Sequence, residues 1–396
     1  QVMENKKRSF ILLMFTLFIT YSAKAQDDSL KSLFKPSFRT GVLLHTYVSS
    51  RQNGFRSDSL TGSSNSWKSE AVLHRARIMA GIFLSKKDYV FIQTELTSPL
   101  GSGKDKSGGI KILDAQYDHT FSNELVVSAG KILVSHNRNG LQSASALLVN
   151  DYAYFQYPYN LSKDSPLQND TGRDVGVNLS GKFLKDKLQY RLGAFSGRRD
   201  FNGQNSSPLR VTGRLEYNFL DIDKHTGTNL GKGKTFTVGG GLDTQGTYIA
   251  AGADVFLDYP LSADGSLTLN AAWSYLTGGN DLSAKYSFAS MIPTQNTQLL
   301  ELGYYIKSLK LQPWIRYEKQ DVNSQSNQRR GLNASGFDKL NTATVFGGGL
   351  SYFFNGYTTN VKLSYVAMQK GVLNASGKVV DKTYGQIRLQ LQLSLF

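Results

Sequence analysis

The chain of 396 residues contains no cysteine. Disulfide bonds and thiolate metal sites are therefore excluded. Proline occurs only 8 times and tryptophan 3 times, whereas glycine occurs 38 times. This balance suits many strands joined by tight turns. No shift in composition and no linker divides the chain, so we expect one large all-β body.

Long hydrophobic runs are also missing, with one exception near the beginning. Residues 10–19 are apolar, follow a basic run at residues 6–8 and precede an A-x-A sequence at residues 23–25. This order is that of a secretory signal peptide, and the apolar run is too short to cross a membrane as a helix. We therefore expect residues 1–25 to be a signal peptide. A helical membrane protein is excluded.

Alternation of apolar and polar side chains is the dominant pattern of residues 26–396. Within residues 171–197, Val175 and Leu179 fall on one phase and Asn178 falls on the other. Such a period of two predicts strands with one apolar and one polar face. A tight polar turn inside this stretch makes it a β-hairpin, and most of the remaining chain repeats the pattern.

We count sixteen such strands of about ten residues, with both termini at the same end. Connections at that end are mostly short, apart from a longer turn at residues 220–233, and those at the other end are mostly long and polar. The pattern predicts a transmembrane antiparallel β-barrel with long external loops and short periplasmic turns, which leaves no unpaired sheet edge in lipid. A secreted β-sandwich or propeller is the alternative, but neither needs an apolar face on nearly every strand.

Three features test the predicted register. Val72, Ala76 and Ile78 are expected together on the apolar face of the second strand. Pro313 lies inside an expected strand, close to its turn, where it forfeits a ladder hydrogen bond. Phe396 falls on the polar phase of the last strand, so we expect a bulge or a frayed end there.

Several stretches carry a family pattern: HRARIMAGIFLSKKDYVFIQTEL (74–96), ILDAQYDHTFSNELVVSAGK (112–131), GRDVGVNLSGKFLKDKLQYRLGAFSG (172–197), LQPWIRYEKQD (311–321) and the closing strand with its terminal Phe396. These stretches resemble the phosphate-selective porin O and P family of Gram-negative outer membranes. The resemblance implies a sixteen-stranded, homotrimeric porin in the bacterial outer membrane, with a third loop that folds inward.

The polar phase of the strands should line the lumen if the apolar phase faces lipid. This phase carries eleven bases and nine acids, a small positive surplus within a chain of formal net charge +15. Arginine suits oxyanions through its planar fork, and rings of Arg and Lys favour anions in pores. We predict that the following residues line the pore and bind anions: Arg75, Arg77, Arg191, Arg210, Arg214, Arg316 and Lys362. The alternative is that these side chains pair with neighbouring carboxylates and only brace a polar wall.

Residues 135–170 form the longest irregular segment of the chain. Long loops in compact folds are usually functional or disordered. The aromatic side chains between Tyr152 and Tyr159 favour packing over disorder. We therefore expect this segment to fold into the barrel and to narrow the pore.

Catalytic and nucleic-acid-binding motifs are missing from the sequence. The stretch TNLGKGKT (228–235) departs from the P-loop pattern at its first position and precedes a strand, whereas that motif needs a helix. The five His residues show no metal spacing, no GxSxG motif occurs, and Lys and Arg do not cluster on one element. We predict no enzymatic activity, no cofactor, no metal and no nucleic-acid partner.

The prediction for function is an outer-membrane porin for passive diffusion of small hydrophilic solutes, with a preference for anions, of which phosphate is one. Its expected partners are small anionic solutes and the lipid of the outer membrane. The alternative is a non-conducting barrel that acts as an interaction or assembly scaffold, with its pore closed by residues 135–170.

Overall fold

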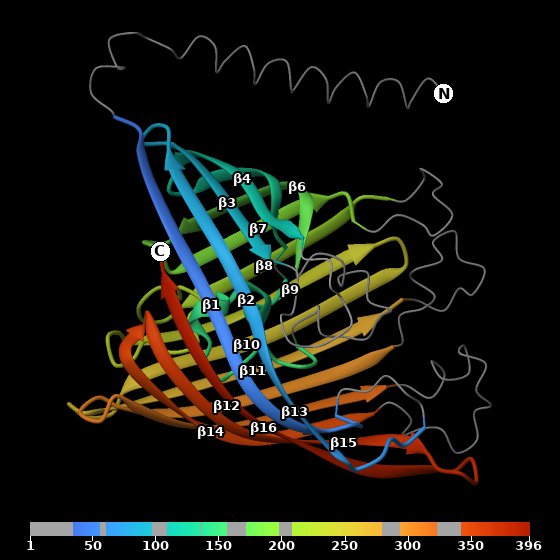
Figure 1. The fold of residues 1–396 in the computed structure, drawn as a ribbon. Helices are drawn as coiled ribbons and strands as arrows, with labels where there is room; N and C mark the ends of the chain where they lie inside the picture. The colour runs from blue at the N-terminus through green and yellow to red at the C-terminus, as the bar shows by residue number, and fades with distance from the viewer. Residues whose placement is uncertain are drawn as a thin grey trace, which may run out of the picture.

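The computed structural model describes residues 35–55, 61–96, 109–134, 136–156, 172–197, 208–278, 294–322 and 342–396. The predicted signal peptide lies outside these ranges. The described residues form sixteen strands and two short helices (Figure 1). The strands are β1 (Ser37–Gln52), β2 (Trp67–Phe83), β3 (Asp88–Leu96), β4 (Ile110–Ser122), β5 (Leu125–Leu133), β6 (Arg173–Phe183), β7 (Leu188–Phe195), β8 (Arg210–Asn218), β9 (Thr235–Gln245), β10 (Tyr248–Pro260), β11 (Gly265–Thr277), β12 (Gln295–Ile306), β13 (Leu311–Val322), β14 (Ala343–Tyr357), β15 (Thr359–Leu373) and β16 (Val379–Leu395). The helices are α2 (Arg138–Leu141) and η1 (Ala144–Ala146).

The strands close into one barrel in which each strand pairs antiparallel with its neighbours in sequence. The barrel is closed by β1 and β16, with Val42 opposite Leu395. The first residues of β1 and the last residues of β16 lie side by side at one end of the barrel. We call this end the short-turn end. Every strand therefore has a partner on both sides, which removes the sheet edges that a bilayer does not tolerate. The predicted fold class is confirmed.

The two faces of the sheet differ in polarity, as the alternation predicts. In β13, Arg316 and Glu318 are buried on the inner face, whereas Ile315 is 49% exposed on the outer face. The same contrast recurs in β6, where Asn178 is buried and Leu179 is exposed. The outside of the barrel is therefore apolar, and its inner wall carries polar and charged side chains.

The prediction for β2 is wrong at Val72. The register between β1 and β2 shifts at His45/Thr46, so that Arg75 pairs with His45 but Leu73 pairs with Thr46. Such a bulge moves the following side chains to the other face. Val72 is consequently buried inside the barrel, whereas Ile78 is 62% exposed outside.

The other two test positions, Pro313 and Phe396, disturb the strands only at their own ends. Pro313 interrupts the β12–β13 ladder, which pairs Gly303 with Trp314 and resumes at Leu311, close to the turn. The β1–β16 register shows no bulge, and Phe396 follows the end of the last strand. The Phe396 ring packs edge-on against Phe91, with 5.7 Å between centroids.

Candidate pore and its infolded segments

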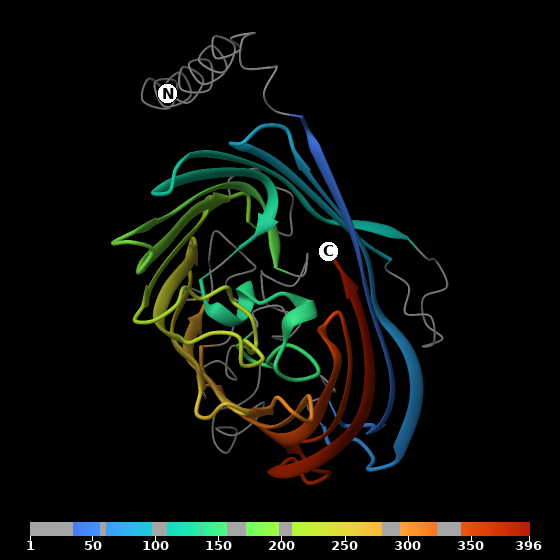
Figure 2. The same cartoon turned by 90° about the vertical axis from the view of Figure 1, so that its left-hand side faces the viewer.

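The connection between β5 and β6 turns into the barrel, where Figure 2 shows its two short helices surrounded by strands. We call residues 136–156 the infolded loop. The side chain of Asn137 caps α2 by accepting a hydrogen bond from the Gly140 backbone N–H at 2.8 Å. The predicted inward fold is present in these residues. Residues 135 and 157–170 lie outside the described part of the chain.

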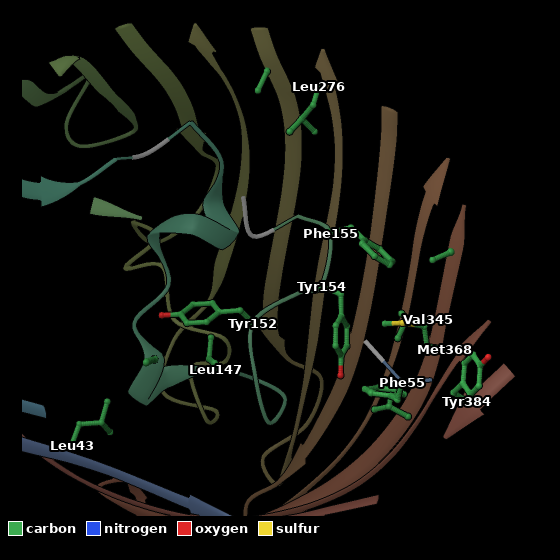
Figure 3. Close-up of a cluster of buried hydrophobic side chains, with 14 of the residues drawn as sticks. Leu43, Phe55, Leu147, Tyr152, Tyr154, Phe155, Leu276, Val345, Met368 and Tyr384 are labelled. Carbon is green, nitrogen blue, oxygen red and sulfur yellow. The ribbon is translucent and has the colours of Figure 1, made fainter. Parts of the chain in front are cut away.

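An aromatic cluster anchors the infolded loop on one side of the lumen. Tyr152, Tyr154 and Phe155 pack among buried side chains of the wall, including Val345 and Met368 (Figure 3). Aromatic side chains contribute much apolar area to such clusters. This part of the lumen is therefore a hydrophobic core.

Asp151 ties the infolded loop to the wall by charge. Its carboxylate lies 2.8 Å from the Arg75 guanidinium, 3.3 Å from that of Arg388 and 3.2 Å from the His74 ring. Burial alone would raise the pKa of Asp151, but Arg75, His74 and Arg388 together hold this pKa well below its usual range. The carboxylate therefore remains charged at neutral pH.

Backbone groups of the infolded loop are also held by wall side chains. The Lys362 ammonium donates to the carbonyls of Leu147 and Val149, the latter at 2.9 Å. The Arg316 guanidinium donates to the carbonyl of Asp151 at 2.8 Å. Three of the predicted anion-binding cations, Arg75, Arg316 and Lys362, thus have donors engaged by the loop.

Three further predicted cations pair with carboxylates of the wall. Their closest ion-pair distances are 3.0 Å for Arg77 with Glu95, 2.6 Å for Arg210 with Asp243 and 2.7 Å for Arg214 with Asp254. Charge-assisted bonds of this kind fix both partners. These three side chains therefore have the geometry of the alternative given above, in which the cations pair with carboxylates and brace the wall.

Arg191 differs from the other six predicted cations. Its side chain is partly exposed and makes no hydrogen bond or ion pair with any described residue. In the β7–β8 register it stands directly opposite Arg214. The seven predicted residues thus fall into three kinds of setting and do not form one continuous ring.

A second segment enters the barrel from the short-turn end. Residues 219–234, which we call the infolded turn, join β8 to β9. The Gly227 backbone N–H donates to the Ala146 carbonyl at 2.5 Å, and a Cβ at Gly227 would lie 2.1 Å from the backbone nitrogen of Leu148. The infolded turn therefore touches the infolded loop inside the lumen.

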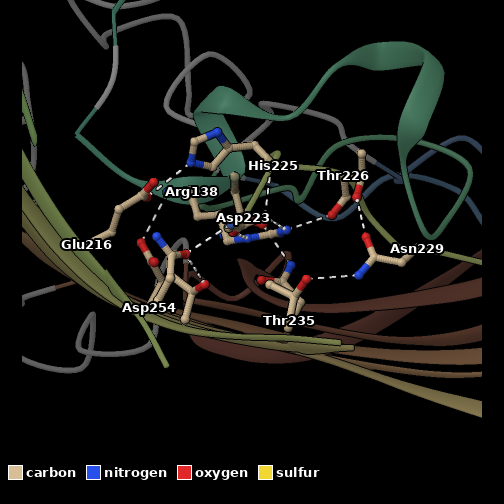
Figure 4. A network of polar contacts seen from close by, with 12 residues as sticks. Arg138, Glu216, Asp223, His225, Thr226, Asn229, Thr235 and Asp254 are labelled. Atoms are coloured by element: carbon tan, nitrogen blue, oxygen red, sulfur yellow. Dashed lines mark hydrogen bonds and ion pairs between the residues drawn. The ribbon is translucent and has the colours of Figure 1, made fainter. Parts of the chain in front are cut away.

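The contact between the two segments is centred on Arg138, which is fully buried (Figure 4). Its guanidinium donates to Asp223 at 3.0 Å and to the Thr226 carbonyl at 2.6 Å. The guanidinium also stands 3.4 Å from the centroid of the Phe256 ring. From the sequence, residues 220–233 were predicted only as a longer turn and Arg138 was not singled out, because neither lies in an alternating pattern.

Two kinds of feature are absent from the described ranges. No group of three or more His, Asp or Glu side chains there could hold a metal ion. No helix among the described residues is long and apolar enough to cross a membrane.

Comparison with solved structures identifies the fold. The outer-membrane channel DcaP of Acinetobacter baumannii is 14% identical, with 91% of this chain and 97% of that chain covered and a TM-score of 0.55. An anion-selective porin from Comamonas acidovorans is 10% identical, with 91% and 100% covered and a TM-score of 0.58. OmpF of Salmonella typhi is 13% identical, with 90% and 97% covered and a TM-score of 0.56.

This likeness establishes the porin fold for the chain. No protein-family model matches the sequence, and no curated protein matches it. The resemblance to the phosphate-selective porin O and P family is therefore supported only at the level of the porin fold. The bacterial outer membrane is the location that this fold and the apolar exterior indicate, as predicted.

Proposed function

We propose that the protein is an outer-membrane pore for passive diffusion of small hydrophilic solutes, with a preference for anions and with phosphate among its solutes. The observation that carries the proposal is a closed barrel whose exterior is apolar and whose charged interior is narrowed by an infolded loop. A lumen narrowed in this way lowers the effective dielectric constant, so each uncompensated charge acts more strongly on a passing ion.

A homotrimer is the proposed assembly. OmpT of Vibrio cholerae, described as a trimer form, has a TM-score of 0.53 to this chain at 12% identity. Cross-linking in detergent followed by mass measurement tests the proposal. A species of three chains is expected, and a monomer at all concentrations would contradict it.

Planar-bilayer recording tests the proposed pore. Purified protein should give discrete conductance steps in potassium chloride. In a salt gradient, its reversal potential should be shifted toward the equilibrium potential of chloride. A reversal potential on the cation side would contradict the anion preference. Absence of steps would contradict conduction itself.

The alternative is a non-conducting barrel that serves as a scaffold. It is supported by the contact inside the lumen between the infolded loop and the infolded turn, which enter the barrel from its opposite ends. The same recording separates the two proposals, because a scaffold gives no conductance steps in correctly folded protein.

A further inference from the structure

A polar cavity of about 180 Å³ lies on the inner wall where β4 to β8 approach the short-turn end. The side chains used in the argument are Ser180, Lys182, Gln189, Arg191, Arg214 and Glu216. All six belong to the inner phase of β6, β7 and β8. The cavity is therefore part of the lumen wall and is set apart from the aromatic cluster.

Two of the three cations that line this cavity have no fixed partner among the described residues. The third, Arg214, is already paired with Asp254 at 2.7 Å and with Glu216, the carboxylate of the lining. Glu216 is already engaged, at 2.9 Å by Arg214 and at 3.0 Å by His225. The side chains of Lys182 and Arg191 make no hydrogen bond or ion pair with any residue that the structure describes.

The strand register concentrates this positive charge. Arg191 stands between Ser180 and Arg214 on the two flanking strands. Like charges directly opposite each other destabilise a sheet. Lys182 pairs with Gln189 and is thus the diagonal neighbour of Arg191, at about 7–8 Å for such positions. An anion between the two cations would relieve the repulsion and use their free donors.

We propose that this cavity binds a small oxyanion through Arg191 and Lys182 and that it sets the ionic preference of the pore. Ser180 and Gln189 supply neutral hydrogen-bonding groups on the same wall. The inference rests on the proposed pore function, and it assigns the preference to one site that combines Arg191, one of the seven predicted cations, with Lys182, which was not among them.

The size of the cavity suits a small ligand. Its volume is about 180 Å³, compared with ~10–15 Å³ that one water molecule requires on the same measure. A phosphate, a sulfate or a short carboxylate fits together with part of its hydration shell. Small anions are therefore the ligands proposed for this site.

The test compares the wild type with the double variant Lys182→Gln, Arg191→Gln in planar bilayers. The double variant should lose most of the anion preference in a potassium chloride gradient. Inorganic phosphate should block the wild-type chloride current, and the half-blocking concentration should rise about tenfold or more in the variant, because charge-assisted bonds are lost. Lys185→Gln is the matched control: it removes the same charge from the exposed turn next to Lys182 and should change neither quantity.

Arg191→Lys provides a second variant for the case in which the double variant does not fold. It keeps the charge but loses the planar fork, so the ionic preference should persist while phosphate block weakens. A wild-type pore that prefers anions, with phosphate block unchanged in Arg191→Lys or with both readouts unchanged in a folded double variant, overturns the cavity site and leaves the proposed function standing. A wild-type pore that does not conduct, or that prefers cations, overturns the proposed function itself.

Discussion

Arginine side chains on the inner face of this barrel mostly bind other parts of the same chain. The sequence placed them correctly on the inner phase, because a period of two fixes the side of each residue. The partner of Arg75 could not be predicted, because Asp151 lies 76 positions away in the infolded loop. The distinction between a free and a paired cation therefore required the structure.

Asp151→Asn should release the infolded loop from the wall. The change leaves the guanidiniums of Arg75 and Arg388 buried without their carboxylate, and loss of a buried partner costs about 3–5 kcal/mol. We expect a larger single-channel conductance in bilayers. Asp264→Asn is the control, because Asp264 lies in an exposed turn at the short-turn end and should leave conductance unchanged. Equal conductance in all three proteins would show that Asp151 does not hold the loop.

The same ion pair predicts a pH dependence. The pKa of Asp151 is depressed in the folded protein, so its stabilising effect is full above the unfolded value of about 3.9 and is lost as pH falls below it. Conductance should therefore be constant between pH 8 and pH 5 with respect to this group and should rise only in more acidic solution. Asp151→Asn should lack the acidic rise. A rise retained in that variant would point to another titrating group.

The connections between strands were predicted less well than the strands themselves. Sixteen strands follow from alternation and turn residues, which are local signals. The infolded turn at residues 219–234 carries no period, and its inward course is decided by contacts with Asp258, Tyr357 and the infolded loop. The bulge in β2 was missed for a similar reason, since one extra residue leaves no mark on composition.

Gly227→Ala should separate the infolded turn from the infolded loop. A Cβ there would lie 2.1 Å from backbone, which cannot move as the end of a side chain can. Overpacking of this kind costs about 1–3 kcal/mol, so we expect a lower unfolding temperature in detergent and a changed conductance. Gly233→Ala in the same turn is the control, because its nearest neighbour would be at an ordinary 3.5 Å. Similar behaviour of the two variants would contradict the close contact.

At the scale of the whole molecule, closure into a barrel and the inward fold of residues 136–156 were predictable, but the entry of the infolded turn into the lumen was not. Closure follows from a physical requirement, since lipid does not satisfy unpaired backbone groups. The contact between the two infolded segments depends on the Arg138 side chain reaching Asp223, and no periodicity in the sequence indicates this contact. The sequence therefore predicted the barrel wall more completely than the segments that enter its lumen.

The apolar exterior predicts an asymmetric response to charge. Leu179→Lys puts a cation on the lipid face, where a position near the midplane costs about 2–4 kcal/mol. Asn178→Lys, one position away on the inner face, should be tolerated far better. The yield of folded barrel in liposomes measures both. Equal losses would show that the assigned register of β6 is wrong.

The origin of the two infolded segments has a consequence for the order of assembly. Both arise from the middle of the chain, between β5 and β6 and between β8 and β9, whereas the barrel is sealed by its first and last strands. Pairing the two ends requires the longest loop closure in the chain and is therefore expected late. The lumen can thus be filled while the wall is still open. The infolded loop and the infolded turn can pack against the open sheet from the side, so neither has to be threaded through a closed ring of strands.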